Sequence, residues 1–179
     1  MAGRDVARVI NRCDQAKEDR RLNLSRCDLT QIPDAVFLLL KNTMLESCNI
    51  SQNLIRRIPS KLAVKFSSVS ELHFNNNHLS SLPDELRQME GLTLLDISHN
   101  HFTALPSVVY RVDSLKILNA QSNSIKEVDV QRLKHMPSMS ELNLQDNPLH
   151  LDIHSQLMGL AEDITVLVTP QDPELDAVD

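Results

Sequence analysis

A pattern of hydrophobic and polar residues recurs six times along the chain. Each copy has apolar residues at its first, third and eighth positions, as in Leu72-x-Phe74-x-x-Asn77-x-Leu79, and five copies have asparagine at the sixth. The sixth positions, which anchor the alignment, are Cys27, Asn53, Asn77, Asn100, Asn123 and Asn147. Successive anchors are 26, 24, 23, 23 and 24 residues apart. A period of this length predicts units that stack on one another and share one continuous core.

The alternation within each copy predicts a short strand, because residues two apart lie on the same side of a strand. We expect the asparagines to be buried, since an amide can both donate and accept hydrogen bonds to the main chain of neighbouring units. Replacing Asn100 by alanine should therefore be costly. Asn76 lies one residue outside the buried series, and its replacement by alanine is expected to cost under about 0.5 kcal/mol.

A second signature follows four of the anchors: the pairs Ile32-Pro33, Ile58-Pro59, Leu82-Pro83 and Leu105-Pro106. Together with the six copies, these pairs resemble the leucine-rich repeat family in its intracellular Ras-suppressor-like type. The resemblance covers residues 19–151. It implies an α/β leucine-rich repeat solenoid, a horseshoe segment of six repeats with a parallel sheet on its concave side.

The two ends of such a stack need covers, because each end leaves apolar surface exposed. Residues 1–18 carry Val6, Val9, Ile10 and Cys13 at helical spacing, which predicts an N-terminal capping helix. Residues 152–169 are expected to form a C-terminal cap through their apolar positions, Leu157, Leu160, Ile164, Val166 and Val168. Residues 170–179 carry four acidic residues, no basic residues and two prolines, which predicts a disordered tail.

Composition narrows the range of functions. The chain has 18 basic and 24 acidic residues, a single tyrosine, no tryptophan and three scattered glycines. It therefore lacks a glycine-rich phosphate loop and an aromatic platform for bases, and its net charge of −6 disfavours nucleic acid as a partner. We expect no cofactor, no metal, no enzymatic activity and a monomer.

Three cysteines are too few for a disulfide framework, and no apolar run is long enough to cross a membrane. We therefore expect a reduced, cytoplasmic protein that has no membrane association, with the nucleus left open as a location.

The residues between the inward positions are expected to face the concave side, and two of them are large and apolar. Leu94 and Ile117 occupy the same position in adjacent repeats, beside Glu71 and Glu141. Apolar residues ringed by polar ones are typical of the centre of a protein interface. The sequence predicts a non-enzymatic protein-binding module, an adaptor or regulatory subunit, whose unidentified partner binds here. Scattered surface hydrophobes are the alternative interpretation.

Charge is unevenly divided along the chain. Residues 1–65 hold 12 basic and 7 acidic residues, a net of +5, whereas residues 66–179 hold 6 and 17, a net of −11. Arg20 and Arg21 lie at the basic end and could steer an acidic partner. A second hypothesis is an RNA–protein complex in which this end recognises RNA or an RNA-bound protein. A solvated face without a partner is the third interpretation.

Four histidines fall in the third and fourth repeats: His73, His78, His99 and His101. His73 aligns with Asp96, and imidazole beside carboxylate can serve as a general base or a metal ligand. No third group converges on them in the sequence pattern, so we interpret these histidines as a titrating surface patch. His73 and Asp96 remain candidate partner-binding residues.

Overall fold

The structure, a computed structural model, describes residues 3–160 and 164–170. Within these residues seven parallel strands form one open sheet in the order in which they occur in the chain. The strands are β1 (Arg21–Asn23), β2 (Ser47–Asn49), β3 (Glu71–His73), β4 (Leu94–Asp96), β5 (Ile117–Asn119), β6 (Glu141–Asn143) and β7 (Thr165–Leu167). The predicted solenoid is confirmed, and the sheet has one strand more than the six predicted repeats.

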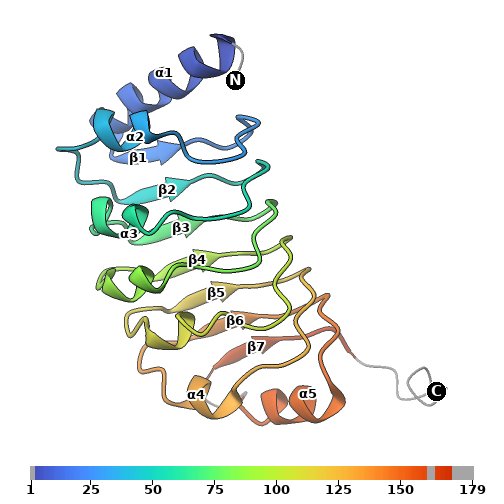
Figure 1. The fold of residues 1–179 in the computed structure, drawn as a ribbon. Helices are drawn as coiled ribbons and strands as arrows, with labels where there is room; N and C mark the ends of the chain where they lie inside the picture. Colours follow the sequence, from blue (N-terminus) through green and yellow to red (C-terminus); the bar gives the residue numbers. More distant parts are fainter. Residues whose placement is uncertain (1–2, 161–163, 171–179) are drawn as a thin grey trace.

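One helix precedes the first strand, and short helices then return the chain from one strand to the next, so that Figure 1 shows a stack of turns with the sheet on one side. They are α1 (Gly3–Asp19), α2 (Asp34–Leu39), α3 (Lys61–Lys65), η1 (Asp84–Gln88), η2 (Val109–Arg111), α4 (Val130–Lys134) and α5 (Leu151–Met158). The two η elements are single 3₁₀ segments. Most of these helices are short, since each has to span only the width of one repeat.

Each of the strands β1 to β6 buries its central residue and turns its two flanking residues outward, as the alternation predicts. The central residues of β1 to β6 are at most 1% exposed: Leu22, Cys48, Leu72, Leu95, Leu118 and Leu142. They belong to a single apolar cluster that runs from Val9 to Ile164. Neighbouring repeats also pack through aromatic contact, because the Phe37 and Phe66 rings stack with their centroids 5.3 Å apart.

The anchor asparagines form the predicted buried ladder. Asn100 accepts a hydrogen bond from the Leu79 N–H at 2.9 Å and donates to the Phe74 and Ile97 carbonyls, both at 3.1 Å. One side chain thus bonds main-chain groups of its own repeat and of the repeat before it. The same arrangement recurs at the buried Asn53, Asn77 and Asn123 and at Asn147, which is half-buried.

At the N-terminal end α1 packs beside β1. Val9 and Cys13 of the predicted apolar stripe are buried, together with Ala16. Val6 and Ile10, predicted to be part of the same covering stripe, are 45% and 40% exposed. The helix turns them away from β1 toward α2, which covers them only in part.

At the C-terminal end α5 and β7 close the stack. Leu157, Leu160 and Ile164 are buried, and Val166 and Val168 are half-buried against the core. Of the tail predicted to be disordered, residues 171–179 lie outside the described part of the chain.

The three cysteines are free thiols, and all three are buried. Burial raises the pKa of the Cys48 thiol to about 12 and that of Cys13 to about 11. Both groups are therefore protonated, and poor nucleophiles, at neutral pH. None of the helices in the described residues is both long enough and apolar enough to span a bilayer.

Candidate functional site

Two rows of side chains cover the outer face of the sheet, because parallel strands in register align equivalent positions. The first row contains Arg21, Ser47, Glu71, Leu94, Ile117, Glu141 and Thr165. The second row contains Asn23, Asn49, His73, Asp96, Asn119, Asn143 and Leu167. We call this surface the sheet face.

Leu94 and Ile117 are direct neighbours in the first row, on β4 and β5. Glu71 precedes them and Glu141 follows them in the same row, as predicted. The two apolar side chains are half-buried, not fully exposed as expected, because they line a hollow together with side chains of the second row. The hollow has a volume of about 200 Å³, and His73, Asp96 and Glu141 contribute to its walls.

The polar groups around this hollow are held by local contacts. Asp96 accepts hydrogen bonds through Oδ1 from the Ser98 N–H at 3.0 Å and from the Ser98 hydroxyl at 2.7 Å. His73 is paired with Asp96 in strand register, but its Nε2 atom lies 3.9 Å from Glu71 Oε2. The geometry therefore directs the imidazole toward Glu71, and Asp96 is engaged elsewhere.

Arg20 and Arg21 lie at the N-terminal end of the sheet, three strands away from Leu94. The Arg20 Nη1 atom is 3.0 Å from Glu46 Oε1, and Arg26 donates to the Gln52 side-chain oxygen. Two of the three arginines near the first strand are thus engaged within the chain. The structure does not bring Arg20 and Arg21 together with the hollow.

Two of the four candidate histidines bond to each other. His78 Nδ1 lies 3.1 Å from His101 Nε2, and the two ring planes differ by 11°. The ring centroids are 5.3 Å apart, which is longer than the nitrogen–nitrogen distance by about the width of one imidazole ring. The rings therefore lie edge to edge and share one hydrogen bond. In the part of the chain that the structure describes, no three His, Cys, Asp or Glu side chains are placed to hold a metal ion.

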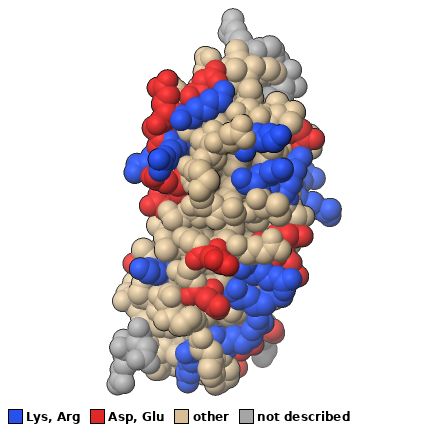
Figure 2. Space-filling view, turned by 90° about the vertical axis from the view of Figure 1, so that its left-hand side faces the viewer, with Lys and Arg blue, Asp and Glu red and all other residues tan. Residues whose placement is uncertain are grey.

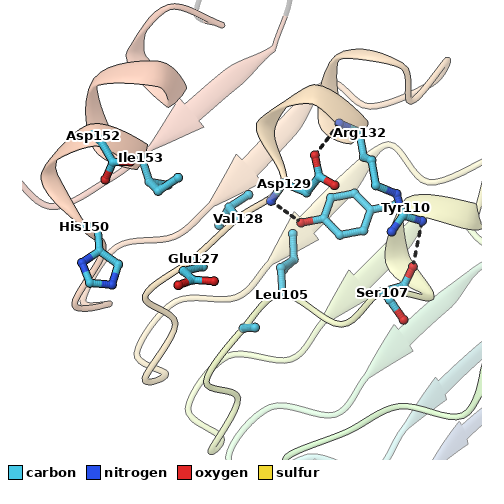
Figure 3. A pocket seen from close by; sticks show the side chains of 11 residues that line it. Leu105, Ser107, Tyr110, Glu127, Val128, Asp129, Arg132, His150, Asp152 and Ile153 are labelled. Atoms are coloured by element: carbon cyan, nitrogen blue, oxygen red, sulfur yellow. Dashed lines mark hydrogen bonds between the residues drawn. The ribbon is translucent and has the colours of Figure 1, made fainter.

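The sequence interpretation missed a larger hollow of about 640 Å³, lined by residues of the fourth and fifth repeats and by His150, Asp152 and Ile153 (Figure 3). Tyr110, the chain's single tyrosine, accepts a hydrogen bond from the Asp129 N–H at 3.0 Å. The Arg132 guanidinium lies over the Tyr110 ring, 4.6 Å from its centroid. Its main-chain N–H donates to Asp129 Oδ1 at 3.0 Å.

These contacts bind the two repeats to each other. Burial raises the pKa of the Tyr110 hydroxyl to about 12, so this hydroxyl is neutral at physiological pH. Because Tyr110 is joined to the Asp129 N–H and the Arg132 guanidinium of the next repeat, we interpret this part of the hollow as a joint between the two repeats. The lone tyrosine in a chain with few aromatic residues was the sequence signal that could have marked it.

Short parallel strands that are connected by helical segments, with a buried asparagine at one fixed position of each repeat, define a leucine-rich repeat protein. A family model described as leucine rich repeat matches residues 43–102, and the chain belongs to this family. Proteins of this family generally act in protein–protein interaction. The chain is 35% identical to leucine-rich repeat-containing protein 20 of Mus musculus over 169 residues, which cover 93% of the chain and 91% of the mouse protein.

The human protein of the same name is 30% identical over 89 residues, which cover 49% of this chain and 48% of the human one. Among solved structures, a leucine-rich repeat protein of Leptospira interrogans matches with a TM-score of 0.71 and 24% identity. An internalin of Listeria monocytogenes matches with a TM-score of 0.64 and 24% identity. The alignments cover 82% and 84% of this chain but only 36% and 43% of the two bacterial chains, and they show the fold alone.

Proposed function

We propose that this protein is a non-enzymatic interaction module that holds a protein partner on its sheet face. The observation that carries the proposal is the pairing of Leu94 with Ile117 across adjacent strands, between Glu71 and Glu141. Half-buried apolar side chains at the centre of a polar surface contribute most to the free energy of binding when a partner removes them from water. His73 and Asp96 flank the same hollow and would orient the partner through polar contacts.

The proposal gives the protein the role of an adaptor or regulatory subunit. Seven strands provide six intervals, so the sheet face is roughly 29 Å wide at the usual strand spacing. That width suits one helix or one small domain. We further propose a monomer in the cytoplasm. Three free, buried thiols support a reducing compartment.

The test is the double substitution Leu94→Asp with Ile117→Asp. Partners are first captured with the parent protein from native cells and identified by mass spectrometry, and one is then titrated in purified form. The double variant should bind at least tenfold more weakly, because the core of an interface tolerates unpaired charge poorly. Stability should fall only modestly, since both side chains lie outside the core but are half-buried and next to Glu71 and Glu141, and urea unfolding checks that the variant remains folded.

A matched control places the same two charges elsewhere. Leu54 and Val64 are 47% and 56% exposed and lie off the sheet face, so Leu54→Asp with Val64→Asp should leave binding unchanged. Should the Leu94 and Ile117 variant fold normally and bind as tightly as the parent, the partner must use another surface and the proposal is wrong.

A further inference from the structure

The second repeat carries two adjacent arginines where other repeats carry uncharged residues. Arg56 and Arg57 directly precede the Ile58-Pro59 pair. The corresponding residues before the other three such pairs are Thr30-Gln31, Ser80-Ser81 and Thr103-Ala104. Since the same turn forms with these neutral side chains, packing does not require the two positive charges.

Neither arginine is neutralised within the described residues. Both side chains are exposed, and neither takes part in an ion pair or a side-chain hydrogen bond there. Arg20 and Arg111 differ in this respect, because they pair with Glu46 and Asp84 at 3.0 and 2.7 Å. On the face shown in Figure 2, Lys and Arg side chains lie in separate clusters on both sides of the molecule, many of them next to Asp and Glu side chains.

Arg56 and Arg57 line a hollow of about 540 Å³ between the first and second repeats. Lys61 lines it too, held by an ion pair with Asp34 and by the Phe37 ring, whose centroid is 4.8 Å from the Lys61 Nζ atom. Three positive charges and one negative charge thus face the same space. We call this hollow, lined by Arg56, Arg57 and Lys61, the basic cleft.

An apolar groove of about 390 Å³ lies on the other side of α2, between α2 and α1. Its walls are entirely apolar, and its most accessible side chains are Val6, Ile10 and Leu38, the last 74% exposed. Asp34 of α2 lines the basic cleft, whereas Leu38 and Leu39 line the apolar groove. One short helix therefore separates a cationic hollow from an apolar one.

We propose that the basic cleft and the apolar groove together bind an acidic amphipathic segment of a partner protein. Carboxylates of the segment pair with Arg56 and Arg57, and its apolar side chains cover Leu38 and its neighbours in the groove. Guanidinium groups suit this role because they bind carboxylates through two parallel hydrogen bonds. Burial of Leu38 and Ile10 adds the hydrophobic part of the affinity.

The distribution of charge along the chain supports an acidic partner at this place. Residues 66–179 carry a net charge of −11 and residues 1–65 a net of +5. The described residues of the second range still carry 11 acidic against 6 basic side chains, so an acidic segment is attracted to the N-terminal repeats and not to the C-terminal ones. This surface is separate from the sheet face, so the chain would hold partners on two sides.

The experiment uses the full chain and a fluorescein-labelled peptide of glutamate and leucine at helical spacing, with fluorescence anisotropy as the readout. Arg56→Ser with Arg57→Ser introduces the Ser-Ser pair that the third repeat already has, so folding should be preserved. We expect binding to weaken about tenfold, and Leu38→Ser alone to weaken it about threefold. A peptide with glutamine in place of every glutamate should bind the parent about tenfold more weakly.

The matched control removes two exposed lysines from the fifth repeat, Lys126→Ser with Lys134→Ser, which changes the net charge by the same amount. It should alter binding less than about twofold, since these lysines lie away from the basic cleft. The Leu94→Asp, Ile117→Asp variant should bind the peptide as the parent does, which separates this proposal from that for the sheet face.

Equal weakening by the two serine double variants would show attraction to net charge alone and overturn the proposal. So would equal binding of the glutamine peptide, or no saturable binding by the parent up to about 1 mM. Binding to anionic phospholipid vesicles without binding to the peptide would assign the surface to membranes instead, and would also overturn it.

Discussion

The two ends of the solenoid differ in their hydrogen bonding: the N-terminal cover supplies donors, and the C-terminal cover supplies acceptors. In the turn that follows each strand, main-chain N–H groups donate toward the next repeat. Leu24 donates to the Asn49 carbonyl at 2.7 Å, and Arg26 to the Ser51 carbonyl at 3.2 Å. The carbonyls of the first repeat therefore have no earlier repeat to donate to them. The N–H groups of the last repeat have no following repeat whose carbonyls could accept from them.

At the N-terminal end, arginines of α1 supply the missing donors. Arg12 Nη1 donates to the Asn23 carbonyl at 2.9 Å and to the Ser25 carbonyl at 2.5 Å. Arg8 Nη1 donates to the Arg26 carbonyl at 3.2 Å. In later repeats, the equivalent carbonyl oxygens accept hydrogen bonds from main-chain N–H groups of the preceding repeat. In the first repeat, which has no preceding repeat, two guanidinium groups supply these hydrogen bonds instead.

At the C-terminal end, the need is for acceptors. The Leu144 N–H donates to the Leu167 carbonyl at 2.8 Å, and the Asp146 N–H to the Thr169 hydroxyl oxygen at 2.6 Å. Val166, the central residue of β7, is only half-buried, whereas Leu22 at the centre of β1 is 1% exposed, so this end is less deeply covered than the one beneath α1. The direction of the main-chain bonds thus decides the chemistry of each cover: cationic donors at the start and neutral acceptors at the finish.

The largest expected effect comes from removing residues 1–18. Leu22 and Leu24, now at most 1% exposed, would lose the cover of Val9, Cys13 and Ala16. At about 25 cal/mol for each Å² of apolar surface exposed, the free energy of unfolding should fall by several kcal/mol. The bared end should also associate with other copies. Urea unfolding and sedimentation measure the two effects.

Two variants sharpen this comparison of the ends. Arg12→Met keeps the length of the side chain but removes its donors, and it should cost about 1–2 kcal/mol. Removing residues 164–179, which include β7, should cost less than removing α1. A protein without residues 1–18 that remains monomeric and melts within a few degrees of the full chain would show that α1 is no cover.

Much of the fold could be predicted from the sequence because the repeat imposes the same local rule six times. A residue such as Leu95 is flanked on both sides by outward positions, so alternation alone indicates its burial. Strand register then places Leu94 beside Ile117, as the alignment predicted. The Asn ladder followed for the same reason, since a buried turn needs a side chain that both donates and accepts.

The features that sequence reasoning missed depend on how distant segments meet. The exposure of Val6 and Ile10 depends on the angle at which α1 crosses α2, which helical spacing does not contain. The half-burial of Leu94 depends on side chains of other strands. The strand Thr165–Leu167 lacks the anchor residue that marked the others, so pattern matching ended one strand too soon.

A second prediction compares an interior repeat with the first one. Asn100→Ala should cost about 1–3 kcal/mol, because it leaves the buried Leu79 N–H without its partner and removes one of the two amide donors of each of the Phe74 and Ile97 carbonyls. Cys27 holds the equivalent position in the first repeat, where its Sγ atom donates one hydrogen bond within the described residues, to the Ser25 carbonyl at 3.5 Å. Cys27→Ala should therefore cost only about 1 kcal/mol.

Urea unfolding of the two variants measures this difference. If the two substitutions lower the free energy of unfolding equally, the amide of Asn100 contributes no more to stability than the thiol of Cys27. The role assigned to the amide would then be wrong.

A smaller effect tests a feature that the first repeat and the interior share. The residue before each anchor has a positive φ, between 52° and 56°, although none of these residues is glycine: Arg26, Gln52, Asn76, His99, Ser122 and Asp146. Asparagine tolerates this left-handed conformation better than alanine does. The structure therefore changes the expectation for Asn76→Ala from under about 0.5 kcal/mol to about 1 kcal/mol.

The cause can be separated from loss of the side chain by a second substitution at the same place. Asn76→Gly removes the amide too, but glycine adopts φ of 55° without strain, so its stability should stay within about 0.5 kcal/mol of the parent. Asn75→Ala, next to it and at negative φ, should also be nearly neutral. If alanine and glycine at position 76 destabilise equally in urea, the amide side chain is responsible and the backbone is not. If alanine lowers the free energy of unfolding and glycine does not, the positive φ of the backbone is the cause. The same positive φ recurs at the residue before each anchor, where the sequence has no glycine to indicate it.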